Sequence, residues 1–325
     1  MGPTAKAFGY TLLYKAPYSW LMALPGGAAM RVPARFGMLM MLALAMAASA
    51  TWARYVPARR RGWLALATVA ILAEGWIVMP VVDVPPRLDV AAIPAGTPVL
   101  SLPMPDGFAP NTAALIRTLD GTRPLVNGFS GYDPPHFTPL HEGLAAGDPS
   151  VLTALQSAAG AYTIVWADGR REPRPALPAP AGPVDPSLAI ADVTTSTGGP
   201  TPLFDGQRRS WWHTDGATPA GTALTLVFDT AVTVSMVELQ MGAWTAGAPG
   251  DLEVLVDDGP GSAATSVWRG STRGLAVIGG LTDPRTIPIR IPLTPVPGRR
   301  VTLTTRADSP LPWAVAEVQA YGRPR

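Results

Sequence analysis

The chain has 325 residues, a formal net charge of +2 and no cysteine. This length leaves room for two or three domains, and so small a net charge gives no reason to expect nucleic acid as a partner. The absence of cysteine excludes a disulfide framework, a thiolate metal site and a cysteine nucleophile. Each domain must therefore be held together by the packing of its core.

Residues 1–35 are predicted to form an interfacial segment at the surface of a membrane. Tyr10, Tyr14, Tyr18 and Trp20 have rings with an apolar body and a polar edge, which suit the boundary between lipid and water. The alternative is a loop that packs against helices absent from this sequence. The opening residues do not form a secretory signal.

Two apolar stretches follow, over 36–53 and 62–82. About 20 apolar residues with a rise of 1.5 Å each cross a hydrocarbon core of about 30 Å. We therefore predict a transmembrane helical hairpin over 36–82. Glu74 lies inside the second stretch, where a carboxyl group is costly. It is either a relay or substrate contact, or the partner in a structural hydrogen bond to a neighbouring helix.

The short loop between the two stretches predicts the orientation of the hairpin. It carries Arg54, Arg59, Arg60 and Arg61. Short loops rich in arginine stay in the cytoplasm, whereas long domains cross the membrane whatever their charge. The long part that begins near Asp83 is therefore expected outside the cytoplasm.

Residues 83–168 alternate short apolar runs with segments that carry helix end signals. Asn111 and Asp148 are expected N-caps, and Gly121 and Gly160 are expected helix ends. The expected strands are 98–104, 123–128 and 161–168, and the expected helices are 112–120, 138–146 and 149–160. This alternation predicts a small external α/β domain.

Polar residues in the α/β segment are candidates for a site. His136 and His141 flank a turn with Asp133 nearby, but a metal or acid–base site needs a third converging ligand. We interpret them as loop histidines. Asn127 and Tyr132 belong to a glycine-containing loop that either binds a ligand or forms turns.

Residues 169–186 are rich in proline and are predicted to form an extended linker. The following part, 187–325, contains short alternating runs separated by glycine, proline and aspartate. This pattern predicts an all-β sandwich. The runs are 222–229, 233–242, 252–258, 286–293, 300–306 and 314–322.

Three segments of this all-β part carry a resemblance, namely 203–212, 233–242 and 313–322. Over about 187–323 the chain resembles the discoidin family, also called coagulation-factor type C or galactose-binding-like domains. The resemblance implies a jelly-roll sandwich. The residues that match the opening and closing patterns of the family, with Ser in place of Thr, are Asp205, Gly206, Ser210, Trp212, Glu317, Tyr321 and Gly322.

The resemblance also implies a possible structural calcium ion. Some members of the family hold calcium near the opening loop, and calcium takes 6–8 oxygen ligands. Asp205, Ser210 and Glu317 match three of the ligand positions, whereas Gln207 stands where an acidic or amide residue is frequent. The alternative is that Asp205 and Glu317 only hydrogen-bond the loop.

Aromatic and basic residues near the same loop suggest carbohydrate binding, because aromatic faces suit the C–H surfaces of sugars. The resemblance assigns Trp212 to the core, and its neighbour Trp211 points the other way in an extended segment. The alternative is that these are ordinary rim residues. The candidate carbohydrate-binding residues are Arg208, Arg209, Trp211, His213 and Trp244.

The segments RVPARF (31–36) and RPLVNGFSGYDPPHF (123–137) carry a second resemblance. The hairpin and the α/β segment resemble the C-terminal region of bacterial polytopic membrane glycosyltransferases of the GT-C type. Those proteins use lipid-phosphate-linked sugar donors. Their catalytic carboxylates lie in an early external loop that has no counterpart here, so the resemblance assigns no catalytic residue to this chain.

Together the two resemblances predict a membrane hairpin, a small α/β domain and a jelly-roll sandwich from the C-terminal part of a glycosyltransferase-like protein. Its external domains are expected to bind or present a glycan or lipid-linked sugar, and its helices to join upstream transmembrane helices. The expected location is the bacterial inner membrane, with the C-terminal domains in the periplasm. The alternative function is a non-enzymatic, membrane-anchored carbohydrate-binding protein.

Overall fold

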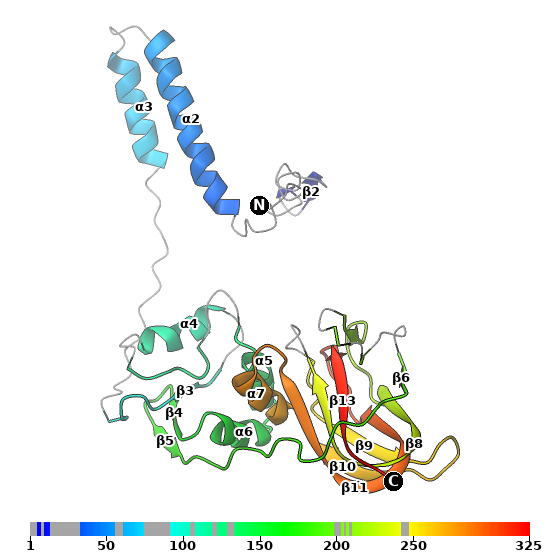
Figure 1. Cartoon of the computed structure of the whole chain (residues 1–325). Coiled ribbons are helices and arrows are strands. Elements are labelled where there is room, and N and C mark those ends of the chain that lie inside the picture. Colours follow the sequence, from blue (N-terminus) through cyan, green and yellow to red (C-terminus); the bar gives the residue numbers. More distant parts are fainter. Residues whose placement is uncertain are drawn as a thin grey trace. The chain divides into compact units, whose positions relative to one another are not determined.

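The computed structural model of the chain divides into two compact units, Met1–Val82 and Asp83–Arg325. Figure 1 traces the elements of each unit along the chain. The residues that the structure describes are 5–7, 10–13, 33–55, 61–74, 92–104, 108–118, 122–128, 133–197, 203–204, 206–207, 210–241 and 247–325.

The first unit contains a strand pair and two helices. β1 (Ala5–Ala7) pairs antiparallel with β2 (Tyr10–Leu13), within the segment predicted to be interfacial. α2 (Pro33–Tyr55) and α3 (Arg61–Glu74) lie where the hairpin is expected. The side chain of Glu74 lies outside the described residues, so its two interpretations stay open.

The length and apolarity of these two helices test the prediction of membrane spans over 36–82. Large apolar side chains on them are exposed, namely Met41, Leu42, Leu44, Met46, Trp63, Leu66, Val69, Ile71 and Leu72. Among the helices in the described residues, none has both the length and the apolarity that crossing a membrane requires. α3 has only 14 residues, and residues 75–82 of the second expected span are not described. The helical pair is confirmed, whereas the two spans are not found.

The second unit begins with a small α/β part around a three-stranded sheet. β3 (Val99–Leu102) pairs in parallel with β4 (Tyr162–Trp166), which pairs antiparallel with β5 (Arg171–Arg174). Leu125 extends the sheet by a parallel bridge to Val99. The prediction of an α/β layer is confirmed, and β5 takes up the first residues of the expected linker.

Three helices accompany this sheet, namely α4 (Phe108–Arg117), α5 (Phe137–Ala145) and α6 (Ser150–Ala158). The cap predicted at Asp148 lies one residue before the observed N-cap of α6, Pro149, although Asp148 Oδ1 accepts the Ser150 N–H at 2.9 Å. The cap predicted at Asn111 is wrong: α4 begins three residues earlier at Phe108, and Asn111 is buried within the helix.

Asn127 has a structural role in this part of the unit. Its side-chain Oδ1 accepts the Ser101 N–H at 3.1 Å, and its Nδ2 donates to the Ser101 carbonyl at 2.8 Å. The amide thus continues the sheet ladder beside β3 with side-chain atoms. Of the two interpretations of the Asn127 loop, the structural one accounts for this residue; Tyr132 lies outside the described residues.

The C-terminal part is an all-β sandwich, as the alternating runs predict. Its main sheet has the order β10–β9–β11–β8–β13, with β6 also paired to β8, and every pairing in it is antiparallel. β7 pairs separately with β12. The strands are β6 (Asp192–Thr195), β7 (Trp212–His213), β8 (Ala223–Gln240), β9 (Leu252–Asp257), β10 (Thr265–Gly270), β11 (Pro288–Thr305), β12 (Ala314–Val315) and β13 (Glu317–Pro324).

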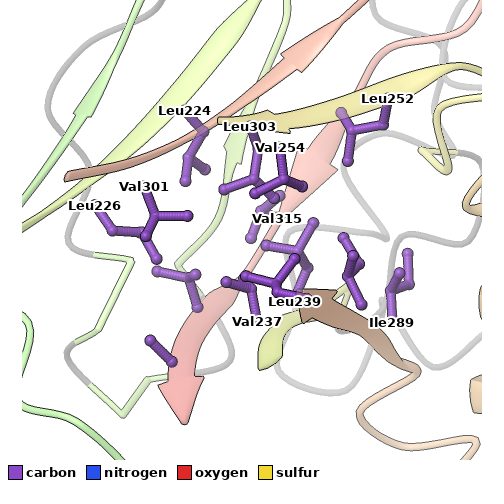
Figure 2. Close-up of a cluster of buried hydrophobic side chains, with 14 of the residues drawn as sticks. Leu224, Leu226, Val237, Leu239, Leu252, Val254, Ile289, Val301, Leu303 and Val315 are labelled. Atoms are coloured by element: carbon purple, nitrogen blue, oxygen red, sulfur yellow. The ribbon is translucent and has the colours of Figure 1, made fainter. Parts of the chain in front are cut away.

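The core of the sandwich follows from alternate burial along these strands, because successive side chains of a strand point to opposite faces. Along the first half of β8, Leu224, Leu226 and Phe228 are buried and the residues between them are half-buried. Figure 2 shows the aliphatic side chains that meet in the centre. They include Leu224, Leu226, Val237, Leu239, Leu252, Val254, Ile289, Val301, Leu303 and Val315.

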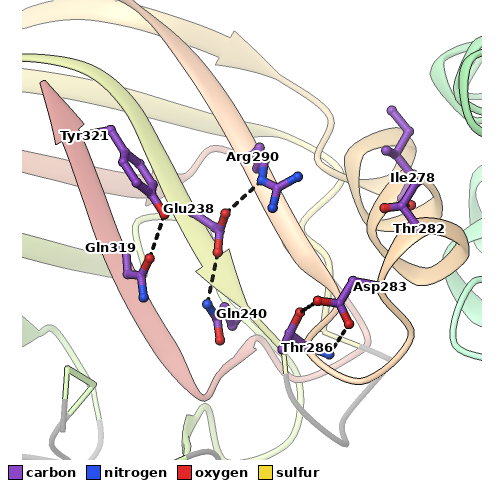
Figure 3. Close-up of polar contacts among 9 residues, drawn as sticks. All are labelled: Glu238, Gln240, Ile278, Thr282, Asp283, Thr286, Arg290, Gln319 and Tyr321. Atoms are coloured by element: carbon purple, nitrogen blue, oxygen red, sulfur yellow. Dashed lines mark hydrogen bonds and ion pairs between the residues drawn. The ribbon is translucent and has the colours of Figure 1, made fainter. Parts of the chain in front are cut away.

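The main sheet also carries polar side chains, and hydrogen bonds between them connect neighbouring strands. Glu238 on β8 is buried, and it accepts from Arg290 Nε on β11 at 2.8 Å and from Gln240 Nε2 at 2.9 Å. On β13, the Tyr321 hydroxyl donates to Gln319 at 2.6 Å. Figure 3 shows these contacts side by side. Both oxygens of the buried carboxylate are thereby satisfied.

One helix packs against both the α/β part and the sandwich. α7 (Arg273–Thr282) connects β10 to β11 and lies beside α5 and α6 in Figure 1. Its Val277 is fully buried in the core of the α/β part. A Cβ added to Gly280 would lie 2.7 Å from the His136 backbone N, and one added to Gly279 would lie 2.5 Å from the Pro288 carbonyl O. These glycines let the helix backbone touch both parts.

The two neighbouring tryptophans at β7 should differ in their effect on stability. Trp212 is 2% exposed, its indole N–H donates to the Thr197 carbonyl at 2.7 Å, and its ring packs edge-to-face on Trp313. Trp212→Ala should lower the free energy of unfolding by about 3–5 kcal/mol. Trp211→Ala, at a side chain 41% exposed, should change it by less than about 1 kcal/mol. Urea unfolding of the full chain measures both; equal losses would show that both rings are core.

A second prediction concerns the close approach of α7. Gly280→Ala should lower the free energy of unfolding by about 1–3 kcal/mol, because its Cβ must push the helix away from a backbone. Gly182→Ala is the matched control, since nothing lies within 4 Å of its added Cβ, and its effect should stay within about 0.5 kcal/mol. If urea melts gave the two variants the same midpoint, α7 would not be tightly packed.

Candidate functional site

A hollow of about 210 Å³ lies among loops of the β-sandwich. It is lined by Thr218 after β7, by residues 247–251 before β9, by Arg273 at the start of α7, and by residues between 305 and 313 after β11. Loops held by a rigid scaffold are the usual place for binding groups. This hollow is therefore a candidate binding site.

The floor of the hollow is fixed by a buried hydrogen-bond cluster. The Trp313 backbone N–H is shared between the hydroxyl oxygens of Thr218, at 2.7 Å, and Thr214, at 3.0 Å. The Thr218 hydroxyl in turn donates to the Leu311 carbonyl at 2.8 Å. The Trp313 ring meets Trp212 edge-to-face with centroids 5.2 Å apart. The loop after β11 is thus tied to the core.

Two carboxylates line the hollow, and each has a partner from the scaffold. Asp251 accepts two hydrogen bonds from Arg269, at 3.3 and 3.1 Å, so its charge is compensated. Asp308 accepts the Ala220 N–H at 2.8 Å and is exposed. Among the described residues, therefore, no Lys, Arg or His side chain forms an ion pair with Asp308.

Arg273 supplies the cationic group of the hollow. Its guanidinium lies against the Cα of Gly250, since a Cβ there would come within 2.6 Å of an Nη atom. The preceding residue, Thr272, binds the Pro249 carbonyl through both its backbone N–H, at 3.0 Å, and its hydroxyl, at 2.7 Å. The start of α7 is thereby fastened to the loop before β9.

Two acidic residues of the α/β part lie within electrostatic reach of Arg273. Burial raises the pKa of Glu142, and the charge of Arg273 opposes that rise. Burial also acts to raise the pKa of Asp148, but hydrogen bonds from Ser150 and Ser271 and the charge of Arg273 hold it below its ordinary value. Both carboxylates therefore lie close enough to interact with the charge of Arg273.

The predicted carbohydrate-binding residues lie elsewhere or outside the described residues. Trp211, just before β7, and His213, in β7, are both exposed, whereas Trp212 between them is buried, and neither exposed residue lines the hollow. Arg208, Arg209 and Trp244 are not among the described residues. A role for these five residues stays a prediction.

The predicted calcium ligands are only partly described. Asp205 lies outside the described residues, and the Ser210 hydroxyl donates to the Gln207 carbonyl at 2.8 Å. Glu317 is buried and lines a second hollow of about 320 Å³ with Phe204. Within the described part of the chain, no three His, Asp or Glu side chains are grouped to hold a metal ion. Calcium binding stays a prediction.

The histidines of the α/β part pack within the structure. The Nε2–H of His136 donates to the Val126 carbonyl at 2.7 Å, because a carbonyl can only accept. The His141 ring stacks on Phe137 with the planes 1° apart. His141 lies within α5, so its interpretation as a loop residue is wrong. Asp133 is exposed and completes no metal group with the other described residues.

Sequence reasoning missed the residues that line the hollow. Thr218, Asp251, Arg273 and Asp308 come from four separate segments and form no motif with a fixed spacing. The start of α7 was also not expected, because its glycines disfavour a helix. The one usable signal in the sequence is that these polar residues stand near the ends of the predicted strands, where loops begin.

Comparison with known proteins finds a likeness for the C-terminal part of the chain. No protein-family model matches the chain, and no curated protein is significantly similar to it. Its C-terminal 40–42% resembles solved carbohydrate-binding modules of family 32, which have the discoidin or galactose-binding-like fold. This is the same family that the sequence of 187–323 resembles, and a glycosyltransferase parent stays a prediction.

Three of these solved structures illustrate the similarity. The CBM32 of AlyQ, in complex with 4,5-unsaturated mannuronic acid, is 19% identical, with a TM-score of 0.33, and the match covers 42% of this chain and 97% of that one. The module from Clostridium perfringens NanJ, with galactose, is 15% identical, with a TM-score of 0.30 and coverage of 40% and 92%. A chitosan-binding module from Paenibacillus sp. IK-5 is 18% identical, with a TM-score of 0.31 and coverage of 42% and 99%. At these values the likeness assigns no ligand to this chain.

His136 should make the stability of the chain depend on pH. Burial lowers the pKa of His136, although its hydrogen bond to Val126 opposes the shift. Below the ordinary value of about 6.5, the unfolded chain takes up a proton at His136 more readily than the folded chain. The free energy of unfolding should therefore fall as the pH drops from about 6.5 toward the lowered native pKa.

Urea unfolding between pH 7.5 and 5.5 measures this dependence. His136→Gln keeps an N–H for Val126 but cannot take up a proton in this range, so its stability should fall less over the same interval. Equal slopes in the two proteins would show that His136 does not titrate differently on folding.

Proposed function

We propose that the chain binds carbohydrate through its C-terminal β-sandwich, with the loop hollow as the binding site. The observation that carries this proposal is the meeting of Arg273, Asp308 and Asp251 around one concave surface. Ligand sites are concave and combine apolar walls with a few placed polar groups. The hollow has both kinds of surface, since Trp313 and Leu311 also line it.

Sugars suit this combination of groups because each hydroxyl both donates and accepts a hydrogen bond. Arg273 offers only donors, whereas Asp308 offers only acceptors. A pair of neighbouring hydroxyls can therefore bond both residues at once. Hydrogen bonds to charged groups contribute about 1.5–3 kcal/mol each, so two such contacts give millimolar-range binding without a large apolar contact.

The exposed Trp211 and His213 provide a second candidate surface, which the sequence favoured. Trp211 precedes β7 and His213 ends it, and both are exposed; Arg208 and Arg209 come before them in the sequence. An aromatic face with flanking polar groups is suited to stacking on a sugar ring. Mutations can distinguish the two surfaces, because Trp211 does not line the hollow.

We also propose that the carbohydrate-binding domain belongs to a membrane protein of the glycosyltransferase-like class, in the bacterial inner membrane with the domain in the periplasm. What supports this is the Arg-rich loop and the quoted sequence segments, together with the exposed apolar side chains of α2 and α3. The competing proposal is a membrane-anchored carbohydrate-binding protein without enzymatic activity. Protease treatment of intact spheroplasts tests the location, because periplasmic domains would be digested before lysis.

Binding of the full chain to an array of glycans tests the main proposal. The array should include galactose- and N-acetylgalactosamine-terminated glycans, chitosan oligosaccharides and uronate oligosaccharides. Asp308→Asn should weaken the binding of the glycan that binds best by about tenfold or more, because a neutral amide replaces a charged acceptor.

Asp168→Asn is the matched control for Asp308→Asn. Each aspartate is exposed and accepts one backbone N–H, at 2.9 Å from Arg170 and 2.8 Å from Ala220, but Asp168 is not in the hollow. The control should bind like the unmodified chain. Loss of binding in Trp211→Ala but not in Asp308→Asn would move the site to the β7 surface, and no bound glycan at all would refute the proposal.

A further inference from the structure

Arg273 belongs to the hollow but is held by the α/β part of the same unit. It opens α7, whose Val277 is buried among side chains of the α/β core. The next residue, Gly274, approaches the start of α6 so closely that an added Cβ would lie 2.8 Å from the Ser150 carbonyl O. The first turn of α7 therefore cannot shift without moving against α6.

A chain of hydrogen bonds runs from the start of α6 to the backbone of Arg273. Asp148 accepts the Ser150 N–H with Oδ1, at 2.9 Å, and the Ser271 hydroxyl with Oδ2. The Ser271 oxygen in turn accepts the Arg273 N–H at 3.2 Å. Because Asp148 uses both oxygens, one carboxylate sets the position of two helix starts.

The side chain of Arg273 is also confined. Its guanidinium fills the space that Gly250 leaves by having no Cβ, and its Nε is buried. Among the described residues, none accepts a hydrogen bond from this Nε. Glu142 and Asp148 attract the charge from the side of the α/β part. A confined donor group beside a hollow is ready to meet an acceptor that enters it.

We propose that Arg273 orients the carbohydrate in the hollow and that Asp148, in the α/β part, is a positioning residue for it. This inference rests on the proposed function and adds to it a role for the α/β part. The α/β part does not touch the sugar. It holds the guanidinium that does, so the binding competence of the sandwich depends on its neighbour.

The position of Arg273 can be measured without any ligand. In the full chain labelled with ¹⁵N-arginine, the Nε–H signal missing from Arg273→Lys identifies this residue. Its exchange with solvent should be slow, because the atom is buried. Asp148→Ala should speed the exchange about tenfold or more, whereas Asp148→Asn, which keeps a hydrogen-bonding group at the junction, should restore most of the protection. Unchanged exchange in Asp148→Ala would overturn the positioning role.

Calorimetry with galactose and with chitosan oligosaccharides then tests the binding role. Arg273→Ala should lower the affinity for the tighter-binding of these two ligands by about tenfold or more. Asp148→Ala should weaken it less, and Asp148→Asn should recover affinity. Gly250→Ala should also weaken binding, since its Cβ displaces the guanidinium while keeping its charge.

Asn127→Ala serves as the stability control for these variants. It removes two buried hydrogen bonds of the α/β part that do not involve α7, so the folded protein should keep its affinity. Loss of affinity in this control equal to that in Asp148→Ala would show a merely structural effect and overturn the inference. If Asp308→Asn weakened binding and Arg273→Ala did not, the inference would fail while the proposed function stood. If neither ligand bound the unmodified chain and the array was also blank, both would fail.

Discussion

The backbone contact of α7 with its two neighbours is the constraint on which the rest of the second unit depends. Gly274 and Gly280 bring the helix against the α/β part, and Gly279 brings it against the start of β11. Each contact is backbone to backbone, so it has no flexible side chain to absorb a shift, and close-packed interiors transmit such shifts. The sandwich and the α/β part therefore share one junction, whose first residue, Arg273, is also a wall of the hollow.

The same junction explains what the sequence could and could not predict. Alternating runs predicted the sandwich, because a strand with one buried face buries every second side chain. This holds for the first half of β8 and for 252–256 of β9, whereas residues 236–239 of β8 are all buried. The runs 222–229 and 233–242 did not reveal that β8 is one strand of 18 residues. α7 was missed altogether. Three glycines in ten residues oppose a helix by propensity, and tertiary packing overrides that preference.

The site was harder to predict than the fold, for a related physical reason. The family resemblance assigned Trp212 to the core and strand alternation then directed Trp211 outward, and in the structure Trp212 is buried and Trp211 is exposed. The hollow instead depends on where four loops end, and loop ends follow from packing across the whole sandwich. The position of Asp308 is set by an N–H of Ala220, 88 residues earlier. No local spacing contains that information.

The charges of the hollow can stay in place because each is supported from behind. Arg269 donates a hydrogen bond to Asp251, and the Ala220 N–H donates one to Asp308. The carboxylates of the α/β part attract the charge of Arg273. A ligand therefore contacts side chains that are already oriented. The entropy of ordering these side chains is lost during folding and does not reduce the affinity. A sandwich cut away at the start of β6 would lose the support of Arg273 and expose Val277, which is buried against the α/β core. The α/β part is thus required both for the stability of α7 and for the geometry of the hollow.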